Sequence, residues 1–212
     1  FCGQTEFYIP AFLYRFLKNI HIHALHGLKQ ETETLEEILK PIGIYAQKRH
    51  DYNLMSIENT SQVGAVKIPN GLTLRRAVFD DIDELTPLQE AYQKEEVLRN
   101  PNDYNRRVCR LGLKKQIAHD KTLVAVIDGK IAGKINTNAF AYNNYQIGGV
   151  YVLPEYRGRG IAGGMTAAFT RLLLSEGKGV SLFVKKDNKP AERIYKQCGF
   201  KKIADYRIVY MC

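Results

Sequence analysis

The sequence contains few cysteines, and they follow no recognisable pairing pattern. Cys2, Cys109, Cys198 and Cys212 are scattered through 212 residues, without a CxxC motif or the regular spacing of a disulfide framework. This scarcity excludes a small fold that depends on disulfides, and it favours free thiols in a reducing compartment. We therefore expect a cytoplasmic protein.

Long hydrophobic runs are also absent. The longest uncharged run, residues 135–154, is interrupted by polar amides, namely Asn136, Asn138, Asn143, Asn144 and Gln146. The hydrocarbon core of a membrane does not accommodate such groups, so we expect no membrane-spanning segment and no membrane partner. With 45% hydrophobic and 25% charged residues, the composition is typical of a globular protein of one or two domains. The chain starts at Phe1 rather than Met, so we expect it to be processed or to form part of a longer protein.

Acidic residues are too few to balance the basic ones, and the imbalance is local. Residues 1–70 carry seven Lys+Arg and seven Asp+Glu, whereas residues 71–212 carry 24 and 15, so the net charge of +9 belongs to the C-terminal part. An excess of positive charge attracts anions. We therefore expect residues 71–212 to bind an anionic ligand.

Residues 1–70 predict a smaller, mainly helical N-terminal region. Apolar residues recur at helical spacing in 12–20, and a second short helix is predicted for 31–39, where Pro41 ends it. A β-like run follows, and then a polar stretch at 58–69 that we interpret as a linker. We place a domain boundary near residue 70 and expect the region before it to be the remnant of a larger domain, one that completes the sheet or the acceptor site.

Residues 71–212 predict a second domain of mixed α/β class. Asp128-Gly129 between two apolar runs is typical of a hairpin with a type I′ turn. Two adjacent glycines in the strand at 147–153 indicate a bulge or the close approach of another backbone or a ligand. The predicted order β-α-(α)-β-β-β-α-β-α-β is an α+β arrangement, a mixed sheet flanked by helices. Its strands cover 72–78, 123–127, 130–136, 147–153, 180–184 and 200–210, and helices start near residues 80, 161 and 190.

A glycine-rich segment, Arg157 to Gly164, leads into the helix predicted from residue 161. Glycines leave backbone N–H groups uncovered, and these groups lie at a helix N-terminus, which carries roughly half a positive charge. Arg157 and Arg159 add formal charge, and arginine matches phosphate oxygens with a bidentate fork. The segment is therefore typical of a diphosphate site.

Other interpretations of this segment are weaker. It is not a Walker A loop, because no Lys-Ser/Thr pair follows the glycines. Gly158, Gly160 and Gly163 spell the GxGxxG of dinucleotide-binding folds, but only 49 residues remain after Gly163, too few for the further βαβ units of such a fold. A glycine-rich connection without a ligand stays open as an alternative.

Two motifs resemble hallmarks of the GNAT superfamily of N-acetyltransferases. The segment from Arg157 to Ala162 resembles its Q/R-x-x-G-x-G/A signature, and the segment from Asn188 to Phe200 resembles its N-x2-A-x3-Y-x3-GF hallmark, with Tyr195 at the tyrosine position. The two motifs occur in the family's order and at its separation. The resemblance covers about residues 72–212 and does not extend over residues 1–70.

The resemblance implies a GNAT-like acyltransferase domain that binds acetyl-CoA, as co-substrate, between the strands at 147–153 and 180–184. Backbone groups of Val150, Tyr151 and Val152 would pair with the pantetheine arm, and Asn188 would contact the same arm. The diphosphate would lie on the loop and first helical turn, namely Arg157, Gly158, Arg159, Gly160, Ile161, Ala162 and Gly163. The implied reaction moves an acetyl group to a primary amine by direct attack.

The resemblance also places the Tyr195 hydroxyl beside the thioester sulfur. A phenol there can donate a proton to the leaving thiolate, so we expect Tyr195 to be the general acid, with simple core packing as the alternative. The positions at which family members carry a catalytic glutamate hold Gln146 and Phe183, which cannot accept a proton. Glu95 and Glu96 are the candidate bases near the acceptor; solvated helix charges, a chain of ordered water or no base at all are the alternatives.

The sequence thus predicts an acetyl-CoA-dependent N-acetyltransferase of an unidentified amine. A CoA-binding sensor without catalysis is one alternative. A nucleic-acid-binding protein is another, but the basic residues gather around one loop and the following helix rather than along a stripe, so we expect no nucleic-acid partner. His21, His23 and His26 share no helix face, and on a strand only the first two would face the same way, so we expect no metal.

Overall fold

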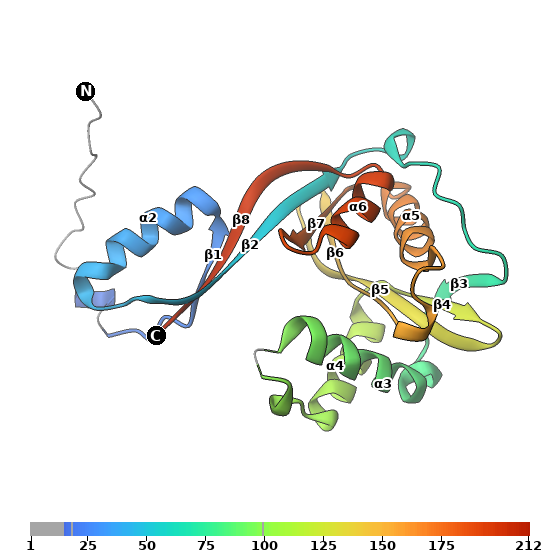
Figure 1. The fold of residues 1–212 in the computed structure, drawn as a ribbon, viewed down its shortest axis with the longest axis horizontal. Helices are drawn as coiled ribbons and strands as arrows, with labels where there is room; N and C mark the ends of the chain where they lie inside the picture. The colour runs from blue at the N-terminus through green and yellow to red at the C-terminus, as the bar shows by residue number, and fades with distance from the viewer. Residues whose placement is uncertain (1–14, 18, 99) are drawn as a thin grey trace. The chain divides into compact units, whose positions relative to one another are not determined.

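The structure, a computed structural model, describes residues 15–17, 19–98 and 100–212. None of the helices in these ranges is both long and apolar enough to cross a membrane. The helices and strands, coloured along the chain in Figure 1, are β1 (Ala24–Leu28), α2 (Lys29–Leu39), β2 (Ala46–Ile57), β3 (Leu72–Arg76), α3 (Ile82–Tyr92), the π-helix η4 (Gln93–Val97), α4 (Arg106–His119), β4 (Thr122–Ile127), β5 (Lys130–Ala141), β6 (Asn144–Val152), α5 (Ile161–Leu174), β7 (Gly179–Lys185), α6 (Lys189–Gln197) and β8 (Lys201–Met211).

The described residues divide into two compact units. Unit 1 comprises the described residues up to Leu54 together with 183–188 and 202–212, and unit 2 comprises 55–182 and 189–201. This grouping differs from the division expected near residue 70. The C-terminal strand belongs to unit 1, and the polar stretch at 58–69 belongs to unit 2.

The polar stretch interpreted as a linker is in fact bonded to its own unit. The Gly64 N–H donates to the Cys198 carbonyl at 3.2 Å. The Arg171 guanidinium donates to the Gly64 carbonyl at 2.8 Å. These tertiary contacts are not visible in local composition, which explains the different interpretation from sequence.

Unit 2 contains a mixed sheet in the order β7-β6-β5-β4-β3. Its neighbours are antiparallel except for β6 and β7, which run parallel from Asn144 opposite Gly179 to Ile147 opposite Leu182. The hairpin between β4 and β5 is confirmed: Asp128 has φ 49° and Gly129 has φ 76°, the left-handed values that a type I′ turn requires. The predicted mixed α/β class is therefore confirmed.

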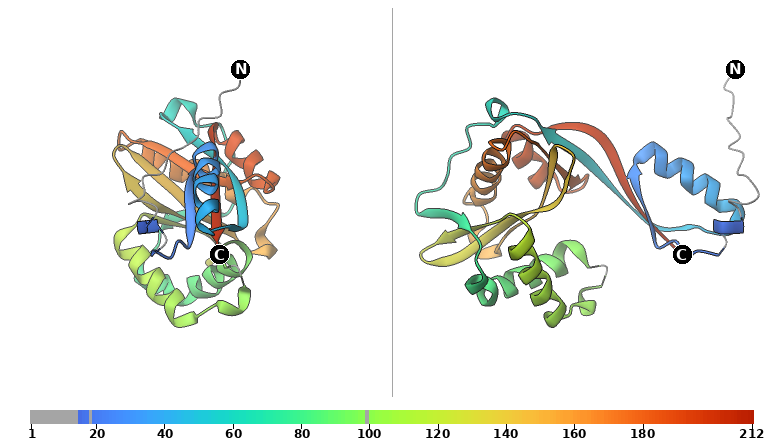
Figure 2. Two further views of the ribbon diagram at one scale, coloured as in Figure 1. Left: turned by 90° about the vertical axis from the view of Figure 1, so that its left-hand side faces the viewer. Right: turned by 180° about the vertical axis from the view of Figure 1, so that it is seen from behind.

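Helices cover both faces of this sheet. α3 and α4 lie on one face, and α5 lies on the other (Figure 2). Between the sheet and α3–α4, a core forms from residues that are almost fully buried, including Leu85, Leu88, Leu113, Val124 and Ile131. Packing in this core positions the end of α3 over β5 and β6.

Unit 1 is built from β1, β8 and β2 with α2 packed on β1. β1 pairs antiparallel with β8, from Ala24 opposite Tyr210 to Leu28 opposite Tyr206. Leu39 of α2 and Val209 of β8 are buried in its small core. α2 confirms the helix predicted for 31–39, whereas the helix predicted for 12–20 lies mostly outside the described residues, and β1 was not predicted.

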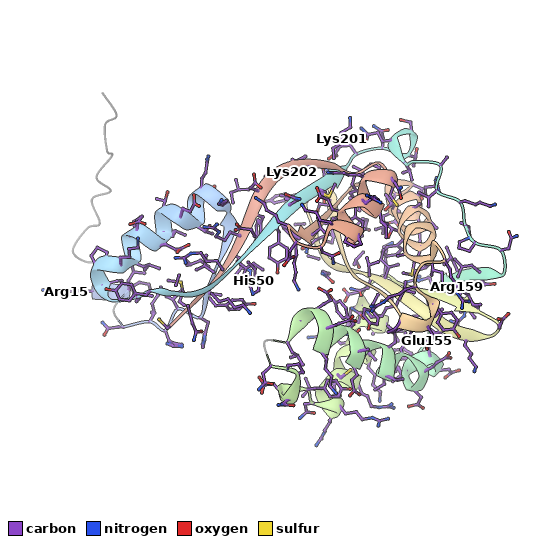
Figure 3. All side chains as sticks on the ribbon, in the orientation of Figure 1. Arg15, His50, Glu155, Arg159, Lys201 and Lys202 are labelled. Carbon is purple, nitrogen blue, oxygen red and sulfur yellow. The ribbon has the colours of Figure 1, made fainter. Side chains whose placement is uncertain are left out.

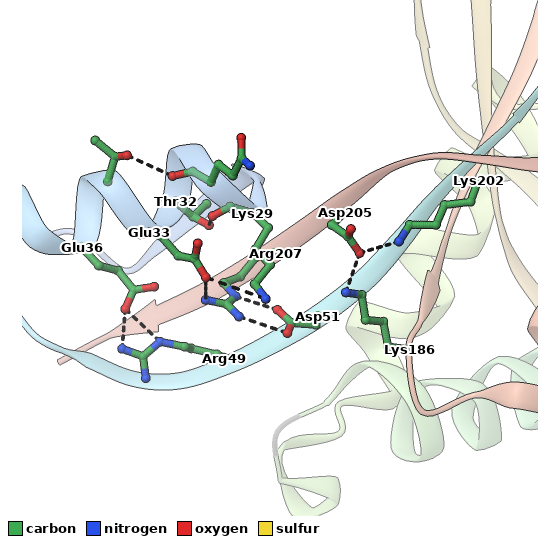
Figure 4. Close-up of polar contacts among 12 residues, drawn as sticks. Lys29, Thr32, Glu33, Glu36, Arg49, Asp51, Lys186, Lys202, Asp205 and Arg207 are labelled. Carbon is green, nitrogen blue, oxygen red and sulfur yellow. Dashed lines mark hydrogen bonds and ion pairs between the residues drawn. The ribbon is translucent and has the colours of Figure 1, made fainter. Parts of the chain in front are cut away.

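Ion pairs hold unit 1 together (Figure 4). Arg207 of β8 donates to both carboxylate oxygens of Asp51 on β2, at 2.6 and 3.0 Å, and to Glu33 of α2 at 3.1 Å. Glu36 of α2 pairs with Arg49 of β2. The Asp51–Arg207 contact lowers the pKa of the Asp51 carboxyl. One guanidinium therefore ties a helix and two strands to each other.

Candidate active site

The glycine-rich loop turns the chain sharply at the start of α5. Gly158 and Gly160 have φ of 78° and 79°, values that only glycine adopts without strain, and Gly160 is the N-cap of the helix. The first intrahelical bond runs from the Gly164 N–H to the Gly160 carbonyl at 3.0 Å. Nothing in the described chain caps this end with a side chain. The N–H groups of the first turn are therefore available to an acceptor outside the helix.

The helix glycines that follow this turn have a packing role as well. A Cβ on Gly163 would lie 3.2 Å from a methyl group of Val66, and a Cβ on Gly164 would lie 3.4 Å from Pro69. The stretch at 66–69 therefore passes close to the first turn of α5 and supports it from behind. The sequence assigned Gly163 only to the phosphate cradle, and this contact adds a structural reason for glycine.

Arg157 contacts protein groups instead of projecting freely from the loop. Its guanidinium forms a bidentate pair with Glu95 of η4, at 2.8 and 3.1 Å, and its Nε donates to the Val152 carbonyl at 3.0 Å. The Tyr151 hydroxyl donates to the same carboxylate at 2.5 Å. These partners differ from the phosphate contacts that the sequence predicts for Arg157. They connect η4, the end of β6 and the glycine-rich loop.

This cluster changes the chemistry of its members. The Arg157 guanidinium and then the Tyr151 hydroxyl lower the pKa of the Glu95 carboxyl. Burial, followed by the neighbouring Glu95, raises the pKa of Tyr151 to about 12. A carboxylate stabilised in this way is a weak proton acceptor, so Glu95 is better suited to positioning the loop than to acting as a base.

Arg159 remains at the surface of the loop. It is exposed near Glu155 (Figure 3), and its guanidinium donates to the Glu155 carbonyl at 3.2 Å while lying 5.4 Å from the centre of the Tyr156 ring. No carboxylate pairs with it among the described residues. The guanidinium is therefore held by neutral groups, and its positive charge stays available to an anion.

The paired glycines of β6 make room for amide side chains from β5. A Cβ on Gly149 would lie 2.1 Å from Oδ1 of Asn136, and a Cβ on Gly148 would lie 2.1 Å from Nδ2 of Asn138. The register between β5 and β6 shifts at this point, and Gly149 has φ 57°. The bulge and close approach that the sequence predicts for this strand are thus present, and the groups that approach are the side chains of Asn136 and Asn138.

A lysine that the sequence analysis did not single out lies beneath this bulge. Lys134 of β5 is 0% exposed, and its Nζ donates to Oδ1 of Asn136 at 2.8 Å. A Cβ on Gly149 would lie 2.8 Å from the same Nζ. Burial lowers the pKa of Lys134 to about 7. The sequence did contain a signal for this burial. The lysine lies in a strand with apolar strands on both sides, and both faces of such a sheet are covered.

Tyr195 of α6 is buried, and its ring packs against Phe200, with ring centres 6.2 Å apart. It is 9% exposed, and burial raises the pKa of its hydroxyl well above the usual value. Tyr92 at the end of α3, Cys198 and Glu96 in η4 raise the pKa of this hydroxyl further. Tyr92, which acts electrostatically on Tyr195, is a residue that sequence reasoning missed.

The remaining predicted residues lie on β6 and in unit 1. Val150 follows the bulge on β6, and Gln146 is paired with Ala139 and Ser181 on the neighbouring strands. The Phe183 ring of unit 1 packs against Tyr206 in a tilted arrangement, with ring centres 4.4 Å apart. Asn188 also belongs to unit 1, where its N–H donates to the Lys185 carbonyl at 3.0 Å. The expected contact of Asn188 with the cofactor stays a prediction.

Comparison with protein families identifies one match. The sequence model of the acetyltransferase (GNAT) family matches residues 83–200, which contain most of α3, the glycine-rich loop and Tyr195. A search of curated proteins finds no match. The described part of the chain contains no group of three or more His, Cys, Asp or Glu side chains that could hold a metal ion.

Solved structures share the fold. A GCN5-related N-acetyltransferase from Sphaerobacter thermophilus is 22% identical, with a TM-score of 0.62 over 88% of this chain and 58% of that chain. A GNAT-family acetyltransferase from Colwellia psychrerythraea is 11% identical, with a TM-score of 0.68 over 94% and 70%. A GNAT-family acetyltransferase from Streptococcus pneumoniae is 20% identical, with a TM-score of 0.52 over 65% and 96%. The first of these proteins is considerably longer than this chain.

Proposed function

Because this chain belongs to the acetyltransferase (GNAT) family, we propose that it transfers an acetyl group from acetyl-CoA to a primary amine. The observation that carries this proposal is the start of α5, where backbone N–H groups of an uncapped helix follow two glycines with positive φ. Such groups bind phosphate oxygens. A Cβ on Gly158 would meet no atom within 4 Å, so the loop has open space for an anion.

The loop and β6 would each hold one part of the cofactor. The N–H groups from Gly158 to Gly163 would bind the diphosphate, and the exposed Arg159 would add a positive charge to it. Backbone groups of Val150, Tyr151 and Val152 would pair with the pantetheine arm, in the way that an added strand pairs with a sheet edge. The Arg157–Glu95 pair would fix the loop relative to β6, as its bond to the Val152 carbonyl supports.

When bound, acetyl-CoA supplies an activated acyl group and a thiolate leaving group. Tyr195 would donate the proton that the thiolate takes up. Burial keeps its hydroxyl protonated at neutral pH because the uncharged form is the one that burial favours. The buried free thiols of Cys109 and Cys198 support a reducing compartment, such as the cytoplasm, for the reaction.

The proposal is tested by binding and turnover on the full chain. Calorimetry with acetyl-CoA measures the affinity, and release of free CoA is followed with spermidine, tyramine, a lysine-containing peptide and a peptide with a free α-amine. We expect binding of acetyl-CoA and turnover of at least one amine. We expect Tyr195→Phe to lower kcat by about 10²-fold, as for removal of a general acid, with little change in the Kd of acetyl-CoA.

The control for this variant is Tyr142→Phe, since Tyr142 is 98% exposed. It should leave both quantities unchanged. Failure to bind acetyl-CoA would contradict the proposed function. Tight binding without turnover of any amine would instead favour a CoA-binding sensor, and normal turnover by Tyr195→Phe would remove the general-acid role alone.

A further inference from the structure

Among the described residues, the buried amine of Lys134 has no carboxylate partner. Its Nζ donates to Oδ1 of Asn136, and no Asp or Glu of the described chain is among the groups that shift its pKa. Its neighbours in the sheet are Val124 on β4 and Tyr151 on β6. An unpaired, fully buried ammonium is costly, so such a group is retained where it has a task or is held uncharged.

Burial, rather than the groups that face it, leaves this amine partly uncharged at neutral pH. From α3, the Tyr92 ring centre lies 5.2 Å from Nζ. From α4, the buried thiol of Cys109 acts on it and raises its pKa slightly, against the larger effect of burial, which lowers the pKa to about 7. Glu90 and Arg106 in turn shift the pKa of the Cys109 thiol. A base is most effective when its pKa is close to the working pH.

The position of the amine connects it to the candidate active site. It lies beneath Gly149, where the strand proposed to hold the cofactor bulges and where the absence of a side chain leaves room for Asn136 Oδ1 and Lys134 Nζ. The half-buried Tyr92 faces the Gly149 backbone with its hydroxyl, and it also acts on Tyr195. Lys134 therefore borders Tyr92, and Tyr92 acts electrostatically on the phenol of Tyr195.

The other candidate bases are less suitable. Glu95 is bound by Arg157 and Tyr151, which stabilise its charged form. Gln146 and Phe183 cannot accept a proton. Glu96 is exposed but acts on Tyr92 and Tyr195, so it is the alternative that an experiment has to separate from Lys134.

We propose that Lys134 is the general base of the acyl transfer, a role that rests on the proposed function: its uncharged Nζ takes a proton from the acceptor amine, directly or through one water. The acceptor nitrogen forms the new C–N bond while the C–S bond breaks and its electron pair stays on sulfur. The nitrogen then loses one proton to Lys134, and the thiolate receives one from Tyr195. The resulting ammonium and phenolate return to their starting forms by exchanging protons with solvent.

The test compares variants of the full chain, with the amine that turns over fastest in the panel above as probe. Lys134→Met removes the base and keeps the length of the side chain, and Lys134→Arg keeps a cation that cannot deprotonate. Lys130→Met changes an exposed lysine on the same strand and is the matched control. Glu96→Gln tests the alternative base. The kcat is measured from pH 5.5 to 9, the Kd of acetyl-CoA by calorimetry, and the titration of Lys134 Nζ by NMR of protein labelled with ¹⁵N-lysine.

We expect the wild type to show a limb of kcat that rises through pH 7 and a Lys134 signal that titrates near the same pH. In both Lys134 variants this limb should disappear and kcat should fall by at least 10²-fold. Their Kd for acetyl-CoA should stay within about threefold of the wild-type value. Lys130→Met should match the wild type. Circular dichroism checks that each variant is folded.

Four results would overturn the inference while leaving the proposed function intact. The first is a normal profile in Lys134→Met. The second is rescue by Lys134→Arg, which would indicate a purely electrostatic role. The third is loss of the limb in Glu96→Gln alone. Titration of Lys134 near pH 10 would also overturn it, and absence of turnover with every amine would overturn it together with the proposed function.

Discussion

At the scale of single residues, burial decides the charge that Lys134 carries. Removing an amine from water disfavours its charged form, and the hydrogen bond to Asn136 does not replace the lost hydration. The pKa of Lys134 is 10.5 in the unfolded chain and about 7 in the fold, so between these values the unfolded chain binds one more proton than the folded one. Stability should therefore rise as the pH is raised through this window.

This linkage gives a prediction that does not depend on the reaction. Between pH 7 and pH 9 the free energy of unfolding of the wild type should increase by about 2 kcal/mol relative to that of Lys134→Met, since one pKa unit corresponds to about 1.36 kcal/mol. Urea denaturation at the two pH values measures it. Other titrating groups cancel in the comparison of the two proteins. Parallel pH dependences would show that Lys134 keeps an ordinary pKa.

Sequence reasoning reached some of these residues and not others. Tyr195 and the glycine loop were identified because short motifs carry them. The partners of Arg157 were not, because Glu95 is 62 positions away in the chain and only the fold brings the two together. Lys134 was missed for a similar reason: a lysine in a strand is usually exposed, and here the packing of Tyr92 and Cys109 against β5 buries it.

At the scale of elements, the N-terminus of α5 depends on one backbone angle. Gly160 has φ 79°, and a side chain there costs about 1–2 kcal/mol because of the clash between Cβ and the backbone. If Gly160→Ala relieves this strain by turning the peptide, the N–H groups of the first turn lose their direction. We expect acetyl-CoA to bind about tenfold more weakly, as 1.4 kcal/mol corresponds to tenfold in Kd. Calorimetry measures the change.

The same helix offers a matched control. Gly177, just beyond its other end, has φ 74° and open space around its Cβ position. Gly177→Ala should therefore introduce similar strain and a similar loss of thermal stability without weakening acetyl-CoA binding. Equal affinities in the two variants would argue against a role for the α5 N-terminus in binding the cofactor.

Elements defined by local chemistry were predictable, and those defined by pairing were not. Asp128-Gly129 fixes its hairpin through the turn itself, and the glycines bound α5 at both ends. α4 was only partly predicted, although its N-cap Asn105, which accepts from the Val108 N–H at 3.1 Å, was a usable signal. β1 is a strand because it pairs with β8, about 180 residues later, and no local pattern indicates this partner.

At the scale of the whole molecule, unit 1 is assembled from distant parts of the chain. It contains the start of the described sequence, a short segment around Lys186 and the C-terminal strand. Its small core contributes less hydrophobic burial than that of unit 2, so its ion pairs matter more to its stability. Arg207 is central because it pairs with Asp51 and Glu33, and its side chain is 11% exposed.

Arg207→Met should therefore destabilise unit 1 selectively, by about 1.5–3 kcal/mol, the range for lost hydrogen bonds to charged groups. Hydrogen exchange read by mass spectrometry should accelerate in β1 and β8 and stay unchanged in β4 and β5.

The effect of the variant should also depend on pH, because Arg207 lowers the pKa of Asp51. The contribution of the Asp51–Arg207 pair to stability is complete above the unfolded pKa of 3.8 and is lost as the pH falls below that value. The effect of the variant should therefore shrink toward pH 3. Lys40→Met, which removes an exposed pair with Glu37, is the control and should change little. Faster exchange in β4 and β5 as well would show that the destabilisation is not confined to unit 1.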